Sequence, residues 1–149
     1  MGFLDRFRRD KPMTDAELNE RSEVDGIKYR DLQVVASLQH HGATLTLPRQ
    51  LVFFLYFADA STARTVDGEF VRRGFNVRSV EGEEEYRMHV PESRYPWAVI
   101  AERYDKALVP NFLRETIDLC EELAEKYGGE YDGWEAGLDE EQMKALKRG

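Results

Sequence analysis

The sequence contains a single cysteine and no hydrophobic run long enough to cross a membrane. One cysteine cannot form an internal disulfide or a zinc site built from cysteines. The longest apolar run, LVFFLYFA at 51–58, is far shorter than the roughly 20 residues of a membrane-spanning helix. The first residues, MGFLDRFRRDK, lack the apolar stretch of a secretory signal. These absences predict a cytoplasmic protein without stable membrane insertion.

The sequence also lacks the short motifs of common catalytic and nucleotide-binding sites, because no GxSxG, HExxH, P-loop or GxGxxG string is present. His40 and His41 are adjacent, so on a helix their side chains diverge by about 100°. His89 has no partner nearby in the sequence. Cys120 falls on the apolar side of a predicted helix, where a thiol is usually a core residue. We therefore expect no catalytic residue, no metal and no cofactor, and the chain is predicted not to be an enzyme.

Negative charge is concentrated in one segment of the chain, whose net charge is −8. Residues 115–141 contain eleven carboxylates and one lysine, whereas residues 1–11 and 142–149 are basic. An acidic surface repels the phosphates of nucleic acids and attracts basic protein segments. The charge distribution therefore predicts a protein partner and no direct binding of nucleic acid.

The part of the sequence before Pro48 contains helix signals. Residues 1–12 are a basic segment, which is either a frayed terminus or a short amphipathic helix. The string TDAE at 14–17 is a capping box, and apolar residues recur at helical spacing over 29–41. Residues 13–48 are therefore predicted to be a helical extension.

After this extension the apolar patterns alternate between strand and helix. Strands are predicted at 51–58, 75–81, 97–104 and 130–134. The stretch 86–90 either extends the second strand or forms a separate hairpin arm. The order β-α-β-β-α-β predicts an α+β fold, the ferredoxin-like plait, in which a four-stranded antiparallel sheet carries both helices on one face. This domain is assigned to residues 49–138, and residues 139–149 form a short C-terminal tail.

The helix predicted over 111–127 is strongly amphipathic. Leu113, Ile117 and Cys120 share its apolar face. The opposite face is acidic and consists of Glu115, Asp118, Glu121, Glu122 and Glu125. This face is a candidate surface for a basic protein segment.

Two aromatic residues flank an Asp-Gly pair in the last predicted strand, EYDGW at 130–134. Asp132-Gly133 predicts a turn or a bulge. Tyr131 and Trp134 each combine an apolar ring with one polar atom. They either clamp the strand against the helix-covered face or lie exposed as an interface hot spot, and the sequence leaves both interpretations open.

The string LAEKYGGEYDGW at 123–134 resembles the C-terminal signature of the RraB family, the regulators of ribonuclease E activity B. The similarity extends in pattern to GFNV at 74–77 and FFLYFADA at 53–60. The resemblance implies a ferredoxin-like fold and a non-enzymatic regulator. Such a regulator would bind the scaffold region of ribonuclease E and lower or redirect its cleavage of RNA. The implied signature positions of the protein-binding site are Glu130, Tyr131, Asp132, Gly133 and Trp134.

The sequence departs from the inhibitor's pattern at both ends. Its C-terminal end, MKALKRG, is short and basic where the inhibitor has a long acidic tail, and the region up to Pro48 is additional. A binding module with an unrelated protein partner is therefore an alternative function. An RNA-binding module is a third, and it would require an open, basic sheet face with exposed aromatic residues. We expect a monomer or a weak dimer.

Overall fold

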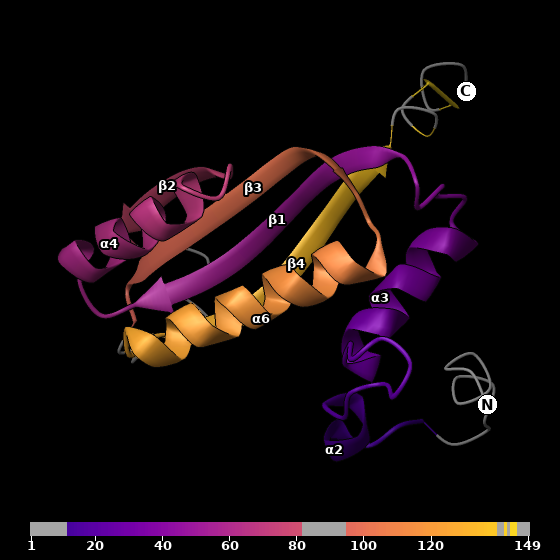
Figure 1. Ribbon diagram of the computed structural model, residues 1–149, viewed down its shortest axis with the longest axis horizontal. Helices are drawn as coiled ribbons and strands as arrows, with labels where there is room; N and C mark the ends of the chain where they lie inside the picture. The colour runs from indigo at the N-terminus through magenta and orange to yellow at the C-terminus, as the bar shows by residue number, and fades with distance from the viewer. Residues whose placement is uncertain (1–11, 82–94, 140–141, 143, 146–149) are drawn as a thin grey trace.

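A four-stranded antiparallel sheet lies at the centre of the computed structural model, which describes residues 12–81, 95–139, 142 and 144–145 (Figure 1). The strands are β1 at Pro48–Phe57, β2 at Asn76–Glu81, β3 at Trp97–Ala107 and β4 at Glu130–Asp139. Their order is β2-β3-β1-β4, so β1 and β3 are central while β2 and β4 form the edges. The predicted α+β fold with a four-stranded antiparallel sheet is confirmed.

Two long helices cover the same face of this sheet (Figure 1). The helices of the described residues are α2 at Asp15–Leu18, α3 at Tyr29–His40, α4 at Ala60–Val71 and α6 at Pro110–Lys126. Buried side chains of α4 and α6 form one core with alternate residues of β1. The largest side chains of this core, each less than 2% exposed, are Leu51, Phe53, Leu55, Phe57, Phe70 and Leu113. The sheet and α6 therefore hold each other in a fixed position.

The helix boundaries follow the capping signals of the sequence. Thr14 precedes α2 as the N-cap of a capping box with Glu17. Asp59 caps α4, because its carboxylate accepts a hydrogen bond from the backbone nitrogen of Thr62 at 2.8 Å. Pro110 lies in the first turn of α6, where its missing N–H costs nothing. Residues within one turn of each helix start thus determine where these helices begin.

The sheet face opposite α4 and α6 carries a second, smaller apolar cluster. It consists of Val52, Tyr56, Ala98 and Ile100, each at most 9% exposed. The strand register places Glu102 and Glu135 on either side of Val52, and Arg78 next to Ile100. Two carboxylates and one guanidinium therefore border this cluster, so the described residues do not make this face basic.

A bulge in β4 determines where its aromatic side chains point. Two consecutive residues of β1 pair with Gly133 and Tyr131, so Asp132 is an extra residue in β4. Gly133 has a φ of +122°, a conformation that residues with a Cβ atom rarely adopt. Because the extra residue shifts the alternation of the strand, Tyr131 and Trp134 both pack on the helix-covered core. Of the turn or bulge predicted at Asp132-Gly133, the structure contains the bulge.

The residues before β1 pack against the same core as α6. Ile27 is 2% exposed and Leu32 is 4% exposed, and both belong to the main core. The chain turns at residues 22–26, where the backbone nitrogen of Gly26 donates to the carbonyl of Ser22 and Gly26 has a φ of +71°. Figure 1 shows α2 and α3 beside one end of the sheet and helix layer. The predicted extension therefore contributes to the folded core.

A buried ion pair lies where β1 begins and β4 ends. Arg49 and Asp139 face each other across these strands, and their side chains are both 0% exposed. Arg49 Nη2 lies 3.1 Å from Asp139 Oδ2 and 2.7 Å from the carbonyl oxygen of Thr44. Asp139 also accepts hydrogen bonds from the backbone nitrogens of Thr44 at 3.0 Å and Gln142 at 2.8 Å. The pair therefore joins the loop before β1, two strands and the residues after β4.

Residues 1–11 of the predicted basic segment 1–12 lie outside the described residues, as does the strand or hairpin arm predicted at 86–90, which contains His89. Within the described part of the chain, no helix combines the length and the apolar composition that crossing a membrane requires.

Candidate functional site

An open groove with a volume of ≈ 530 Å³ lies between α6, the first half of β4 and the residues around the start of α3. α6 contributes Glu121, Ala124 and Glu125, and four of the five signature residues, 130–133, line the groove from β4. The third wall comes from Asn19, Lys28, Arg30 and Asp31. The groove therefore brings the predicted signature together with the predicted acidic helix.

The fifth signature residue, Trp134, lies beneath this groove. It is 8% exposed, and its ring stacks on Phe53 with centroids 6.5 Å apart and an interplanar angle of 25°. Its Nε1 donates a hydrogen bond of 2.9 Å to Asp31 Oδ1. Trp134 thus clamps β4 to both the sheet core and α3. The sequence left open whether Trp134 clamps the strand or lies exposed as an interface hot spot, and the structure agrees with the clamp.

Asp31 is a buried carboxylate on the floor of the groove, with 7% of the residue exposed. Burial raises the pKa of Asp31 above its ordinary value, although the hydrogen bond from Trp134 and the charge of Lys28 oppose that shift. The raised pKa means that ionisation of Asp31 costs folding stability at neutral pH. No local pattern in the sequence points to Asp31, because its hydrogen-bond partner lies 103 residues away.

Tyr131 has its ring packed against the main core and its hydroxyl oxygen buried. This hydroxyl has no hydrogen-bond partner among the described residues. Burial raises the pKa of Tyr131, so the phenol is neutral at physiological pH. Tyr131 therefore contributes apolar surface rather than charge to the groove.

Glu130 and Asp132 are the exposed members of the signature. Together with Glu125 of α6 they place three carboxylates around the groove. Desolvation raises the pKa of Asp132. A nearby cation would stabilise these charged groups, so this part of the groove is suited to lysine or arginine side chains.

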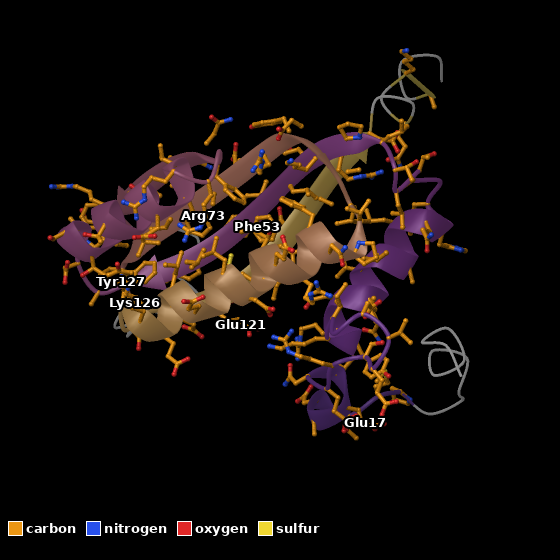
Figure 2. All side chains as sticks on the ribbon, viewed as in Figure 1. Glu17, Phe53, Arg73, Glu121, Lys126 and Tyr127 are labelled. Carbon is orange, nitrogen blue, oxygen red and sulfur yellow. The ribbon has the colours of Figure 1, made fainter. Side chains whose placement is uncertain are left out.

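The acidic face of α6 is partly neutralised within the chain. Arg21 Nη2 lies 2.8 Å from Asp118 and 3.2 Å from Glu121, and Lys28 also pairs with Glu121. Figure 2 shows Glu121 projecting from α6 on the side of the N-terminal helices. The remaining residues of the predicted face are exposed and form no ion pair with a described basic side chain; they are Glu115, Glu122 and Glu125.

Within the part of the chain that the structure describes, the residues with potential catalytic chemistry do not converge. Cys120 is fully buried in the core, and burial raises the pKa of its thiol. The rings of His40 and His41 meet edge to face at the end of α3, with centroids 5.5 Å apart. Among the described residues, no group of three or more histidine, cysteine, aspartate or glutamate side chains is arranged to hold a metal ion.

The family model for RraB, described as regulator of ribonuclease activity B, matches residues 29–136. This match begins at the first residue of α3 and includes α4, α6 and the EYDGW signature. No curated protein matches the chain. Because the matched residues make up more than half of the 149-residue sequence, the chain belongs to the RraB family.

Proposed function

We propose that this chain regulates ribonuclease E by binding to it as a protein, without catalysing a reaction itself. The observation that carries the proposal is the RraB family match, which includes α6 and the β4 residues 130–133 that line the groove. The family implies regulation of ribonuclease E activity, and the exposed carboxylates of the groove provide a surface for a basic protein segment. The scaffold region of ribonuclease E is the proposed partner.

Within the signature, the structure supports a division between contact residues and positioning residues. Glu130 and Asp132 are exposed and are proposed to contact the partner. Trp134 is buried, and Gly133 permits the bulge, so they are proposed to hold the contact residues in place. Glu125 of α6 lines the same groove and extends the proposed contact surface, whereas Glu122 lines a separate pocket with Arg73 and Arg103.

We also propose that residues 49–138 form a ferredoxin-like plait and that residues 13–48 are an extension of it. The element order β-α-β-β-α-β and the packing of α4 and α6 on one face support this description.

A binding module with an unrelated protein partner uses the same acidic surface and remains the second candidate. An RNA-binding module receives less support from the structure. On the sheet face opposite the helices Tyr56 is buried, and the exposed Tyr104 donates its hydroxyl to Glu102, which borders this face with Glu135. Stacking platforms for RNA require exposed aromatic rings in basic surroundings.

The proposed contact residues can be tested by titration calorimetry with the scaffold region of the host's ribonuclease E. We expect binding that weakens as salt is raised, because exposed charges are screened over about 8–10 Å at ordinary ionic strength. The variant Glu130→Gln/Asp132→Asn is expected to bind about three- to tenfold more weakly, since exposed carboxylates contribute modestly to the binding free energy. These substitutions change exposed side chains, so the fold is expected to persist.

The matched control is Glu102→Gln/Glu135→Gln, which removes the same number of negative charges from the opposite sheet face. It is expected to bind within about twofold of the unchanged protein, because it alters only the long-range field. Equal weakening by the two variants would show that Glu130 and Asp132 are not contact residues. Absence of binding by the unchanged protein would remove the scaffold region as the partner.

A further inference from the structure

Residues 21–28 form a tight turn, here called the Arg21–Lys28 turn, that lies against α6. Arg21 and Lys28 pair as an antiparallel β-bridge at its base. The backbone nitrogen of Ser22 donates to the carbonyl of Ile27 at 2.8 Å, and that of Gly26 donates to the carbonyl of Ser22 at 2.9 Å. Ile27 is 2% exposed and anchors the turn in the main core. The turn therefore has a defined conformation and position.

Both basic residues of this turn are directed at α6. Arg21 reaches Asp118 and Glu121, and Lys28 reaches Glu121. Arg21 is held in place by a second hydrogen bond, 2.8 Å from its Nη1 to the carbonyl of Gly26. The side chains of Arg21 and Asp118 are 40% and 49% exposed, so water and partners have access to this pair. Exposed pairs of this kind exchange partners at little energetic cost.

The turn lies outside the part of the chain that matches the RraB family. The match begins at residue 29, just after Lys28, whereas α6 with its acidic face lies inside it. The chain therefore adds two cations from outside the matched region to an acidic surface within that region. Their ion pairs occupy carboxylates that a basic partner segment would otherwise contact.

We propose that the Arg21–Lys28 turn is an intramolecular occupant of the acidic surface of α6 that competes with basic segments of a protein partner. It pairs with Glu121, which lines the groove, and with Asp118 beside it, and leaves the partner the other exposed carboxylates of the groove, Glu125, Glu130 and Asp132. This inference rests on the proposed function only for the identity of the natural partner. The competition itself concerns any arginine- or lysine-bearing segment.

The first test uses a short synthetic peptide in which arginine alternates with serine, titrated into the full chain. The variant Arg21→Gln/Lys28→Gln is expected to bind this peptide about three- to tenfold more tightly, because two carboxylates lose their internal partners. The matched control, Arg64→Gln/Arg72→Gln, removes the same charge from exposed residues of α4 and its C-cap. It is expected to change the affinity by less than about twofold, because Glu69, the partner of Arg72, keeps its ion pair with Arg73 and the remaining effect is that of the long-range field.

A double-mutant cycle separates competition from a general charge effect. Asp118→Asn/Glu121→Gln is expected to change peptide affinity little in the unchanged chain, because the turn already occupies these carboxylates. In the Arg21→Gln/Lys28→Gln background the same substitutions are expected to abolish the gain in affinity. Thermal unfolding of each variant, followed by circular dichroism, confirms that only folded proteins are compared.

Equal affinities of the turn variant and the α4 control would overturn the proposal, as would the absence of peptide binding to every form. Additive effects in the cycle would also overturn it. A parallel titration with the ribonuclease E scaffold region separates the two proposals. If the turn variant gains affinity for the peptide while no form binds the scaffold region, the proposed function fails and the competition stands. If the scaffold region binds every form and the turn variant gains no affinity for the peptide, the competition fails and the proposed function stands.

Discussion

Arg49→Met is expected to lower the free energy of unfolding by roughly 3–5 kcal/mol, the cost of leaving one member of a buried ion pair uncompensated. Both side chains of the pair are 0% exposed, so water cannot replace the guanidinium beside Asp139. The variant also removes the hydrogen bond from Arg49 to the carbonyl of Thr44. Urea unfolding followed by tryptophan fluorescence measures the change.

The double variant Arg49→Met/Asp139→Leu provides the control. It removes both charges at once, and an apolar pair of similar volume often replaces a buried ion pair with little loss. We expect the double variant to be more stable than Arg49→Met alone. A loss below about 1 kcal/mol for Arg49→Met would show that the pair is accessible to water and contributes little.

The same ion pair predicts loss of stability in acid. Burial alone would raise the pKa of Asp139, but backbone hydrogen bonds from Gln142 and Thr44, with the charge of Arg49, lower it below its ordinary value. A lowered pKa in the folded state stabilises the protein above the pKa of the unfolded chain, and this contribution is lost as the pH falls through the folded value. Unfolding of Asp139→Asn should therefore depend less on pH below about 4 than unfolding of the unchanged protein.

Trp134→Ala is expected to cost roughly 3–5 kcal/mol of stability, as is typical when a large aromatic side chain is deleted from a core. Trp134 is 8% exposed, stacks on Phe53 and donates to the buried Asp31. Its deletion leaves a cavity and removes the hydrogen bond that stabilises the Asp31 carboxylate. Chemical unfolding followed by circular dichroism measures the loss without relying on tryptophan fluorescence.

Asp132→Ala, two residues away in the same signature, is the matched control. Its side chain is exposed, and surface substitutions usually change stability by less than about 0.5 kcal/mol. A large effect of Trp134→Ala with a small effect of Asp132→Ala would establish the clamp. Similar small effects of both variants would mean that Trp134 is not a core residue and would favour its interpretation as an interface residue.

Local signals in the sequence account for most of the secondary structure. The capping box at Thr14, the cap at Asp59 and the proline at the start of α6 act within one turn of chain, so neighbouring residues suffice to predict them. The apolar run of β1 is likewise a local pattern, and it predicts a central strand that the structure contains.

The candidate site was harder to predict, because it depends on contacts between distant parts of the chain. The family resemblance treats EYDGW as one signature, whereas the bulge at Asp132 separates its members into buried and exposed residues. The hydrogen bond from Trp134 to Asp31 joins residues 103 positions apart, and no local pattern encodes it. The neutralisation of Glu121 by Lys28 also spans 93 positions, so the sequence showed a uniformly acidic face.

Regulation of ribonuclease E through its scaffold region is tested most directly by the rate of RNA cleavage by the host's enzyme at increasing concentrations of this chain. The assay uses the full-length enzyme and a truncated enzyme that lacks the scaffold region. A regulator that acts by protein contact should slow or redirect cleavage by the full-length enzyme and leave the truncated enzyme unchanged. Unchanged cleavage by both enzymes, or an equal effect on both, would contradict regulation through the scaffold region.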